Sequence, residues 1–370
     1  MELEKSLNHV EKMLVGRAKE RRQPIYGSLE LLPLCNMNCD MCYVRLSKQE
    51  MESRGRLRTA EEWLTLGEEM AESGVLYLQL TGGEPLLHPG FREVYLGLKK
   101  LGMILTINTN GTLIDEGWAA FFAAHKPRRM NISLYGTSDE AYSRLCHYPG
   151  GFYRTIEAIR SLRAHGVDVK LNVVLTNANK SEIDQYYALS RELDVPINID
   201  TYLFPATRER ERTFLHETRP SPEEVAAARI RIMQLEMGEA AFRQQAVREV
   251  TYIDALPDQL FQPRRIDCLA GSCSFVVNWQ GMLRPCIMMK NPEVSVFDTG
   301  FEQGWQQIHV QSKKLFLPTA CGHCRMRSIC GVCAASMEEE ISEKGAPSYL
   351  CRTAEAMLKL LRSAAEGSHG

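Results

Sequence analysis

The sequence lacks the long apolar runs, the charge imbalance and the export signal that would assign it to several large classes of protein. No stretch approaches the roughly 18 uninterrupted apolar residues of a membrane-spanning helix. The formal net charge of the 370-residue chain is −2. The chain therefore has no excess of positive charge that would indicate binding to nucleic acid or to an acidic membrane. Residues 1–24 place Leu7, Val10 and Leu14 at helical spacing among charges, which predicts an amphipathic helix and not a signal peptide. We therefore expect a cytoplasmic protein without a nucleic-acid or membrane partner.

Against these absences, the chain has twelve cysteines. Disulfide bonds are disfavoured in a reducing compartment, so clustered cysteines there indicate metal or redox chemistry. Three cysteines lie within residues 35–42, one at position 146 and eight between positions 268 and 351. This uneven distribution divides the chain into four predicted parts. They are an N-terminal amphipathic helix (1–25), a repeating region (26–205), a linker with a bridging helix (206–264) and a cysteine-rich domain (265–370).

The repeating region alternates a strand with a helix six times. The strands are predicted at residues 26–34, 75–81, 103–109, 129–135, 168–175 and 196–203. Capping boxes, in which a hydroxyl and a carboxylate satisfy the free amides of a helix start, are predicted for Thr59 with Glu62 and for Thr137 with Glu140. Strands and helices that alternate at this spacing form right-handed parallel units, hence an open sheet or a barrel.

Each predicted strand has one polar face and one apolar face. The polar residues, taken two apart, are Ser28 and Glu30; Tyr77, Gln79 and Thr81; Thr106, Asn108 and Asn110; Asn131 and Ser133; Lys170 and Asn172; and Asn198, Asp200 and Tyr202. A parallel sheet covered on both sides by helices would be apolar on both faces. One polar face fits a curved sheet around a wet or ligand-filled interior. We predict the α/β class with a partial (β/α)6 TIM-like barrel; the alternative is a doubly wound sheet with a few buried, satisfied polar groups.

The first cysteine group follows the first predicted strand directly. Cys35, Cys39 and Cys42 have the spacing C-x3-C-x2-C. Active sites of βα barrels lie in the loops after the strands, so the position suits catalysis. Three thiolates can hold three irons of a four-iron cluster and leave the fourth iron open, whereas a structural cluster normally uses four cysteines. The alternative is a zinc site completed by a distant histidine.

Together with the segment Thr81-Gly82-Gly83-Glu84-Pro85 after the second strand, this cysteine motif resembles the radical S-adenosylmethionine (SAM) superfamily. The resemblance implies that the open iron chelates the amino and carboxylate groups of SAM, and glycine lets bare backbone approach that ligand closely. It assigns the SAM contacts to Gly82, Gly83, Glu84, Asn110 and Ser133. The family often has an aromatic residue before the third cysteine, where this chain has Met41.

The C-terminal cysteines follow the spacing C-x4-C-x12-C and then C-x2-C-x5-C-x2-C-x17-C. Between Cys273 and Cys286 the sequence predicts a β-hairpin. Eight cysteines suffice for two fully ligated four-iron clusters. The alternative is two structural zinc ions, but paired zinc knuckles need a separation of about 15–20 residues, and only five residues separate Cys324 from Cys330.

This half of the chain resembles the SPASM extension of many radical SAM enzymes, including its G-x4-C element from Gly281 to Cys286. The resemblance implies two auxiliary clusters, hence three [4Fe–4S] clusters in all. It assigns the first auxiliary cluster to Cys268, Cys273, Cys286 and Cys333, and the second to Cys321, Cys324, Cys330 and Cys351. Cys146 belongs to neither set and is predicted to be a small buried hydrophobic residue.

The combined resemblance implies an enzyme that reductively cleaves SAM to a 5′-deoxyadenosyl radical and oxidatively modifies a peptide or protein. Thioether or carbon–carbon crosslinks of a ribosomal peptide are the expected products, with a flavodoxin- or ferredoxin-type protein as external electron donor. One alternative is an anaerobic sulfatase-type maturase that forms formylglycine. Those enzymes place an aspartate after the hairpin cysteine, where this chain has Ile287. The alternative of another class, a non-catalytic iron–sulfur electron carrier, would not need the GGEP segment.

The last predicted strand ends its polar face with Asp200 and Tyr202, near the opening where a substrate would meet the radical. We predict that these two residues position a peptide side chain or take a proton from it. The alternative is that both satisfy neighbouring backbone or barrel groups. Because the barrel is predicted to begin near Tyr26, we expect no leader-recognition domain before it, so a leader peptide would bind elsewhere or to a separate protein.

Overall fold

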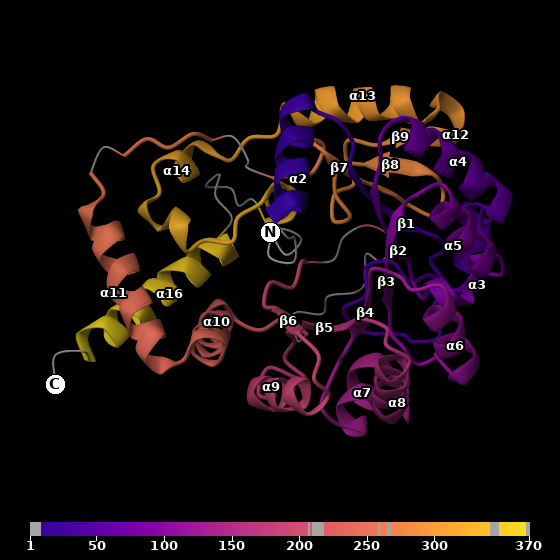
Figure 1. The fold of residues 1–370 in the computed structure, drawn as a ribbon. Helices are drawn as coiled ribbons and strands as arrows, with labels where there is room; N and C mark the ends of the chain where they lie inside the picture. Colours follow the sequence, from indigo (N-terminus) through magenta and orange to yellow (C-terminus); the bar gives the residue numbers. More distant parts are fainter. Residues whose placement is uncertain are drawn as a thin grey trace.

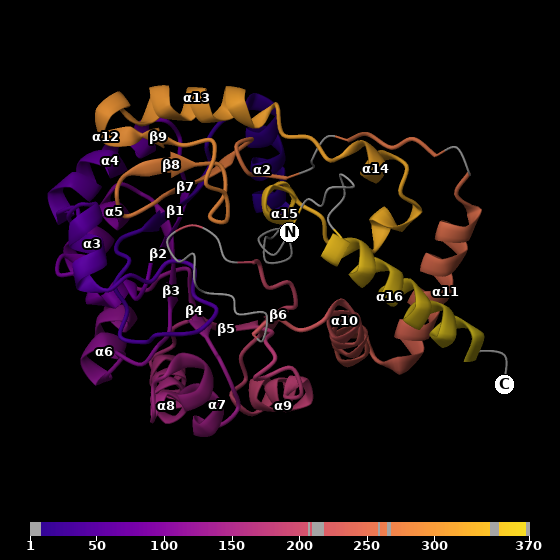
Figure 2. The ribbon, with the colours of Figure 1, turned by 180° about the vertical axis from the view of Figure 1, so that it is seen from behind.

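The computed structural model describes residues 9–205, 208, 218–257, 260–264, 268–340 and 348–367. One nine-stranded sheet, in the order β6-β5-β4-β3-β2-β1-β7-β8-β9, runs through the larger body of the molecule (Figures 1 and 2). None of the described helices combines the length and the apolar character needed to cross a membrane.

Six parallel strands form the barrel wall. They are β1 (Tyr26–Glu30), β2 (Tyr77–Thr81), β3 (Ile104–Thr109), β4 (Arg129–Ser133), β5 (Val169–Val174) and β6 (Ile197–Asp200). Each lies within a predicted range and is shorter at its ends. The strands neighbour one another in chain order from β1 to β6 without a reversal, whereas a doubly wound sheet reverses its order in the middle. The predicted α/β class and partial barrel are therefore confirmed.

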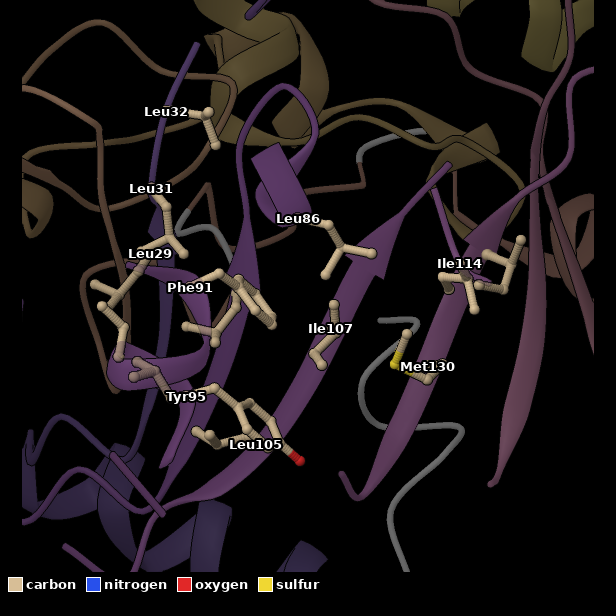
Figure 3. Close-up of a cluster of buried hydrophobic side chains, with 14 of the residues drawn as sticks. Leu29, Leu31, Leu32, Leu86, Phe91, Tyr95, Leu105, Ile107, Ile114 and Met130 are labelled. Atoms are coloured by element: carbon tan, nitrogen blue, oxygen red, sulfur yellow. The ribbon is translucent and has the colours of Figure 1, made fainter. Parts of the chain in front are cut away.

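Helices cover the outer, apolar face of these strands. They are α4 (Ala60–Glu72), α5 (Phe91–Lys100), α6 (Glu116–Ala124), α7 (Asp139–Cys146), α8 (Gly151–Ala164) and α9 (Ile183–Glu192), with α3 (Lys48–Arg54) after the first cysteine loop and α2 (His9–Arg21) before β1. Figure 3 shows Leu105 and Ile107 of β3 beside Phe91 and Tyr95 of α5, all buried. Burial of such side chains stabilises the fold by about 1.5–3 kcal/mol each.

One of the two predicted capping boxes is present. At the start of α4, Thr59 accepts from the backbone N–H of Glu62 at 3.2 Å, and the Glu62 carboxylate accepts in return at 2.8 Å. The box predicted for Thr137 is wrong, because α7 begins one residue later with Ser138 as its cap. The carboxylate of Glu182, next to α9, accepts from the Thr137 backbone and hydroxyl at 2.7 and 3.0 Å. Thr137 therefore bonds to Glu182, which is distant in the sequence, and not to the predicted local partner Glu140.

The predicted hairpin between the cysteines is confirmed as β7 (Ser274–Val277) and β8 (Met282–Arg284), followed by β9 (Val294–Ser295), α12 (Val296–Thr299) and α13 (Phe301–Ser312). The sequence did not predict that β7 would pair in parallel with β1. This pairing extends the barrel sheet beyond β1. It brings the loop after Cys286 beside the loop that begins at Cys35.

A second body is built from helices. The bridging segment forms two helices, α10 (Pro222–Met237) and α11 (Glu239–Ala255), and α16 (Ser348–Glu366) packs against both. Phe242, Ile253, Met357 and Leu361 are among the buried residues they share. The short α14 (Thr319–Gly322), η2 (Arg325–Ser328) and α15 (Ala334–Glu340) connect this body with the sheet (Figures 1 and 2). The bridging helices α10 and α11 therefore share a core with the C-terminal helix α16.

Candidate active site

A cavity of about 550 Å³ runs the length of the barrel interior. It extends from the first cysteine loop, at the carboxyl ends of the strands, to Tyr26, Tyr77 and Arg128 near their starts. Its walls include the inward side chains Gln79, Thr81, Thr106, Asn108, Asn131, Ser133, Lys170, Asn172, Asn198 and Asp200. The predicted polar inner face is therefore confirmed for β2 to β6, whereas Ser28 and Glu30 of β1 are not among the residues that line the cavity.

Hydrogen bonds between adjacent strands hold this polar wall in place. Asn108 Oδ1 accepts from Gln79 Nε2 at 3.0 Å and from Asn131 Nδ2 at 2.8 Å, and Ser28 donates to Gln79 at 3.1 Å. Amide groups that bond to one another need no charged partner, so they can stay in a recessed cavity at little cost. The wall is thus preorganised before a ligand enters.

The three cysteines of the first group all line the cavity. Backbone N–H groups donate to two of their sulfurs, Met37 to Cys35 at 3.4 Å and Arg45 to Cys42 at 3.3 Å. The loop is anchored to the last turn of α7, where the carbonyl of Cys146 accepts from the N–H of Asn38 at 3.1 Å. Cys146 itself is fully buried, as predicted.

Burial keeps the thiols of this loop protonated unless a metal binds them. Burial, followed by the nearby Glu84 carboxylate, raises the pKa of the Cys35 thiol far above its usual range. The pKa of Cys39 is also raised, by its contact with Cys146 and by burial. Buried thiols ionise when a metal supplies positive charge. The donors therefore fit an iron–sulfur cluster.

Within the described ranges, no three His, Cys, Asp or Glu side chains are grouped so that they could hold one metal ion. In a four-iron cluster each thiolate binds a different iron. The preference for a cluster over a zinc ion therefore rests on the three-cysteine motif.

The Gly82–Gly83 turn packs directly on the backbone that leads into this loop. A Cβ at Gly82 would lie 2.4 Å from the Leu32 carbonyl oxygen, and a Cβ at Gly83 only 2.2 Å from that of Leu34. The N–H of Gly83 donates to Leu32 at 2.7 Å and that of Glu84 to Leu34 at 2.9 Å. Because these N–H groups are used, the carbonyl oxygens of the turn are the groups suited to receive the amino group of SAM.

The Glu84 side chain serves the loop after β3. Its fully buried carboxylate accepts from the Thr109 hydroxyl and from the N–H of Asn110, both at 2.8 Å, and from the N–H of Leu86 at 3.1 Å. Burial raises its pKa to about 7 although these donors favour the charged form. Gly82 and Gly83 line the cavity and Glu84 does not. A SAM contact at Glu84 would therefore use its backbone.

Asn110 and Ser133, the other residues expected to contact SAM, both line the cavity near the strand ends. The Asn110 amide already bonds to Asn36 and Thr112. The two residues thus lie where the resemblance requires them, and their contact with SAM stays a prediction.

Asp200 and Tyr202 line the cavity on the side of β6. The Asp200 carboxylate accepts from the N–H of Tyr202 at 3.0 Å, and the Tyr202 hydroxyl donates to Glu340 of α15 at 2.7 Å. Arg219 bonds to the same Glu340 carboxylate. Burial and the adjacent Glu340 charge hold the pKa of Tyr202 far above its usual value, so its phenol stays protonated. The hydroxyl joins the barrel to α15 and not to a backbone or barrel group, and the two residues' catalytic roles remain a prediction.

The C-terminal cysteines fall into two neighbourhoods. Burial raises the pKa of Cys286 to about 12, and the charges of Cys333 and Cys268 add to the effect. Cys273 is fully buried beside β1, where its carbonyl accepts from the N–H of Ile25 at 2.9 Å. These residues belong to the set expected for the first auxiliary cluster.

The second neighbourhood lies where α14 and η2 meet the start of α16. Burial raises the pKa of Cys321, and the charges of Cys351 and Cys324 add to it. The pKa of Cys351 is raised in the same way, by burial and then by Cys330 and Cys324. The four thiols that influence one another are those assigned to the second auxiliary cluster.

Sequence reasoning missed a buried ion pair beside the cavity. The Arg208 guanidinium donates twice to the Glu30 carboxylate, each time at 2.6 Å, and once to the Ile287 carbonyl at 2.8 Å. The exposed fractions of the two side chains are 1% and 0%. The pair joins the end of β1 to the loop after Cys286.

We expect Glu30→Gln to destabilise the protein by about 3–5 kcal/mol, because the Arg208 charge would stay buried without a counter-charge. Urea unfolding of the anaerobic protein, followed by circular dichroism, measures this effect. Glu192→Gln is the control: Glu192 pairs with Arg160 at the surface, where both side chains are 61% exposed, so its midpoint should change little. Equal shifts for the two variants would contradict the importance of the buried pair.

Comparison with known proteins agrees with this geometry. Residues 29–189 match the family model described as the radical SAM superfamily. The chain contains a radical SAM domain. The loop of Cys35, Cys39 and Cys42 lies within this domain and offers the donors that the [4Fe–4S] cluster of the family would need.

Two curated relatives are similar to most of this chain. The AdoMet-dependent heme synthase of Methanosarcina barkeri is 26% identical over 321 residues, which cover 83% of this chain and 90% of that protein. The PqqA peptide cyclase of Rhizobium meliloti is 23% identical, with 83% of this chain and 80% of that protein covered. Among solved structures, Streptococcus suis SuiB bound to precursor peptide SuiA has a TM-score of 0.68 at 16% identity, covering 94% of this chain and 82% of SuiB. The fold thus matches over both the barrel and the cysteine-rich extension.

Proposed function

We propose that this radical SAM enzyme oxidatively modifies a peptide or protein and forms a thioether or carbon–carbon crosslink. The observation that supports this proposal is the composition of the cavity wall. This wall contains the cysteine loop and also Ile287 and Met288, which directly follow Cys286 and pack in one cluster with Phe204. A side chain in this space would lie between the SAM-cleaving site and the cysteines of the first auxiliary set.

The chain's own residues bind and enclose the reactants. When bound, SAM and its cluster supply a carbon radical that can abstract hydrogen. The Gly82–Gly83 backbone would hold the SAM amino group, and the walls from β2 to β6 would exclude water. Burial of Met37, Met41 and Met288 beside the cavity gives the region near the cysteines an apolar lining. Such a lining protects a radical from side reactions.

We also propose two auxiliary [4Fe–4S] clusters, held by Cys268, Cys273, Cys286 and Cys333 and by Cys321, Cys324, Cys330 and Cys351. The grouping of seven of these thiols, all but Cys273, into two electrostatic neighbourhoods supports this assignment. Full cysteine ligation leaves no iron open to substrate, so these clusters suit electron transfer. A flavodoxin- or ferredoxin-type protein would provide the electrons.

A peptide substrate is favoured by the relatives. One relative is named a peptide cyclase and the SuiB structure holds a precursor peptide, whereas the heme synthase suggests a tetrapyrrole as second candidate.

The experiment is to incubate the reduced enzyme and SAM with a small peptide encoded beside its gene and, separately, with a sulfatase-motif peptide. We expect a mass loss of two hydrogens in the neighbouring peptide. Efficient formylglycine formation in the sulfatase peptide would establish the sulfatase-type alternative instead. Because Ile287 occupies the place of the aspartate in those enzymes, that outcome would require a different base.

A further inference from the structure

We propose that Asn36, Asn110 and Thr112 are positioning residues for the SAM-cleaving cluster, because together they aim an amide N–H at the sulfur of Cys35. None of the comparisons assigns such a role. The inference rests on the radical SAM domain and is independent of the peptide substrate.

The three side chains close a ring of hydrogen bonds between two loops. Asn110 Nδ2 donates to Asn36 Oδ1 at 2.9 Å, Asn36 Nδ2 donates to Thr112 Oγ1 at 2.8 Å, and Thr112 Oγ1 donates to Asn110 Oδ1 at 2.7 Å. Asn36 belongs to the cysteine loop, while Asn110 and Thr112 follow β3. Each of the three side chains donates and accepts, so removing one group leaves partners unsatisfied in a buried place.

A backbone contact fixes which way the Asn110 amide points. The N–H of Thr112 donates to Asn110 Oδ1 at 2.9 Å. A backbone N–H can only donate, so it selects the oxygen and sends Nδ2 to the opposite side. There Nδ2 lies 3.7 Å from Cys35 Sγ. The hydroxyl of Thr112 donates to the same oxygen at 2.7 Å, so the N–H and the hydroxyl of Thr112 set the direction of the amide together.

The position of Asn110 is fixed from the other side as well. The Glu84 carboxylate accepts from the N–H of Asn110 at 2.8 Å and from the Thr109 hydroxyl at the same distance. Asn110 is only 5% exposed. Both its backbone and its amide are therefore held, and the N–H that faces Cys35 cannot easily move away.

The consequence appears when Cys35 loses its proton to bind iron. As a thiol it donates to Asn36 Oδ1 at 3.9 Å; as a thiolate it can only accept. The donors that face it are then Met37 N, at 3.4 Å, and Asn110 Nδ2. Donors to cluster sulfurs stabilise the more negative, reduced state and so raise the reduction potential.

The test compares Thr112→Val, which removes the hydroxyl at almost constant volume, with Thr112→Ser, which keeps it. Two readouts need no substrate: the release of iron to the chelator ferrozine, and the midpoint potential of the electron paramagnetic resonance signal that changes when SAM is added. We expect Thr112→Val to release iron from this cluster about 10-fold faster or more and to lower the midpoint. Thr112→Ser should behave like the parent protein.

Thr155→Val is the matched control, because Thr155 is also fully buried and its hydroxyl faces the backbone carbonyls of Gly151, at 2.9 Å, and Asn110, at 3.2 Å, and not the Asn110 amide. It should leave both readouts near those of the parent. Asn110→Asp should exceed Thr112→Val, since a second oxygen would face the Cys35 sulfur. Parent-like behaviour of Thr112→Val, or an equal change in Thr155→Val, would overturn the proposal; complete loss of this cluster in Thr112→Val alone would support it.

Discussion

Replacing Cys35, Cys39 and Cys42 together by alanine is expected to abolish SAM cleavage and to remove about one third of the iron. The parent protein, reconstituted without oxygen, should hold roughly twelve irons in three four-iron clusters. The loss would be confined to one cluster, because these thiols line the barrel cavity and the other eight lie beyond β6 in the chain. Iron analysis and the yield of 5′-deoxyadenosine measure both effects.

Cys146→Ala provides the control for this experiment. Cys146 is fully buried next to the same loop, where its carbonyl accepts from Asn38 and its thiol contacts Cys39. Alanine keeps the carbonyl and removes a thiol that belongs to no predicted cluster, so the iron content should stay at the parent value. Stoichiometric zinc without iron, or SAM cleavage that survives the triple substitution, would contradict the assignment of the loop.

The barrel could be predicted because each strand repeats one physical pattern. Polar residues two apart face the cavity, and the residues between them, such as Leu78 and Leu80, are buried under helices. A period of two on six segments is a strong signal, since it depends on neighbours in the sequence alone. The three-cysteine loop and the glycine turn were predictable for the same reason.

The pairing of β7 with β1 could not be predicted, since it joins segments almost 250 residues apart. The residue that permits this pairing is Gly27. A Cβ there would lie 2.4 Å from the Phe275 ring of β7 and 2.9 Å from Leu78 of β2. The glycine makes room for the incoming strand, but in the sequence it looks like any small residue in a strand.

Ion pairs and hydrogen bonds between side chains are the second feature that could not be predicted from the sequence. Arg208 lies in a segment where arginine and glutamate alternate, and no pattern shows which charge becomes buried against Glu30. The Asn36, Asn110 and Thr112 ring is similar, because its members are ordinary loop residues until two loops meet. Hydrogen bonds depend on distances of a few tenths of an ångström, which sequence periodicity does not encode.

Cys286→Ala and Cys330→Ala, each from one auxiliary set, are expected to keep SAM cleavage measurable and to abolish modification of the substrate. Radical generation depends on the barrel loop, whereas oxidation of the substrate radical depends on the proposed auxiliary clusters. Each variant should therefore form 5′-deoxyadenosine without product. Mass spectrometry of the peptide and chromatography of 5′-deoxyadenosine, run on the same reaction, measure this uncoupling.

Misfolding is the main competing cause of lost product, because cluster binding contributes to the folding of small cysteine-rich domains. The two variants separate these causes by position. Cys286 precedes Ile287 and Met288 in the cavity wall, while Cys330 contacts the core shared by α10, α11 and α16. A folding defect at Cys330 should leave the barrel, and hence SAM cleavage, intact. Normal product formation by either soluble variant would exclude a catalytic role for its cluster, and loss of SAM cleavage in both would show that the barrel depends on the extension for its fold.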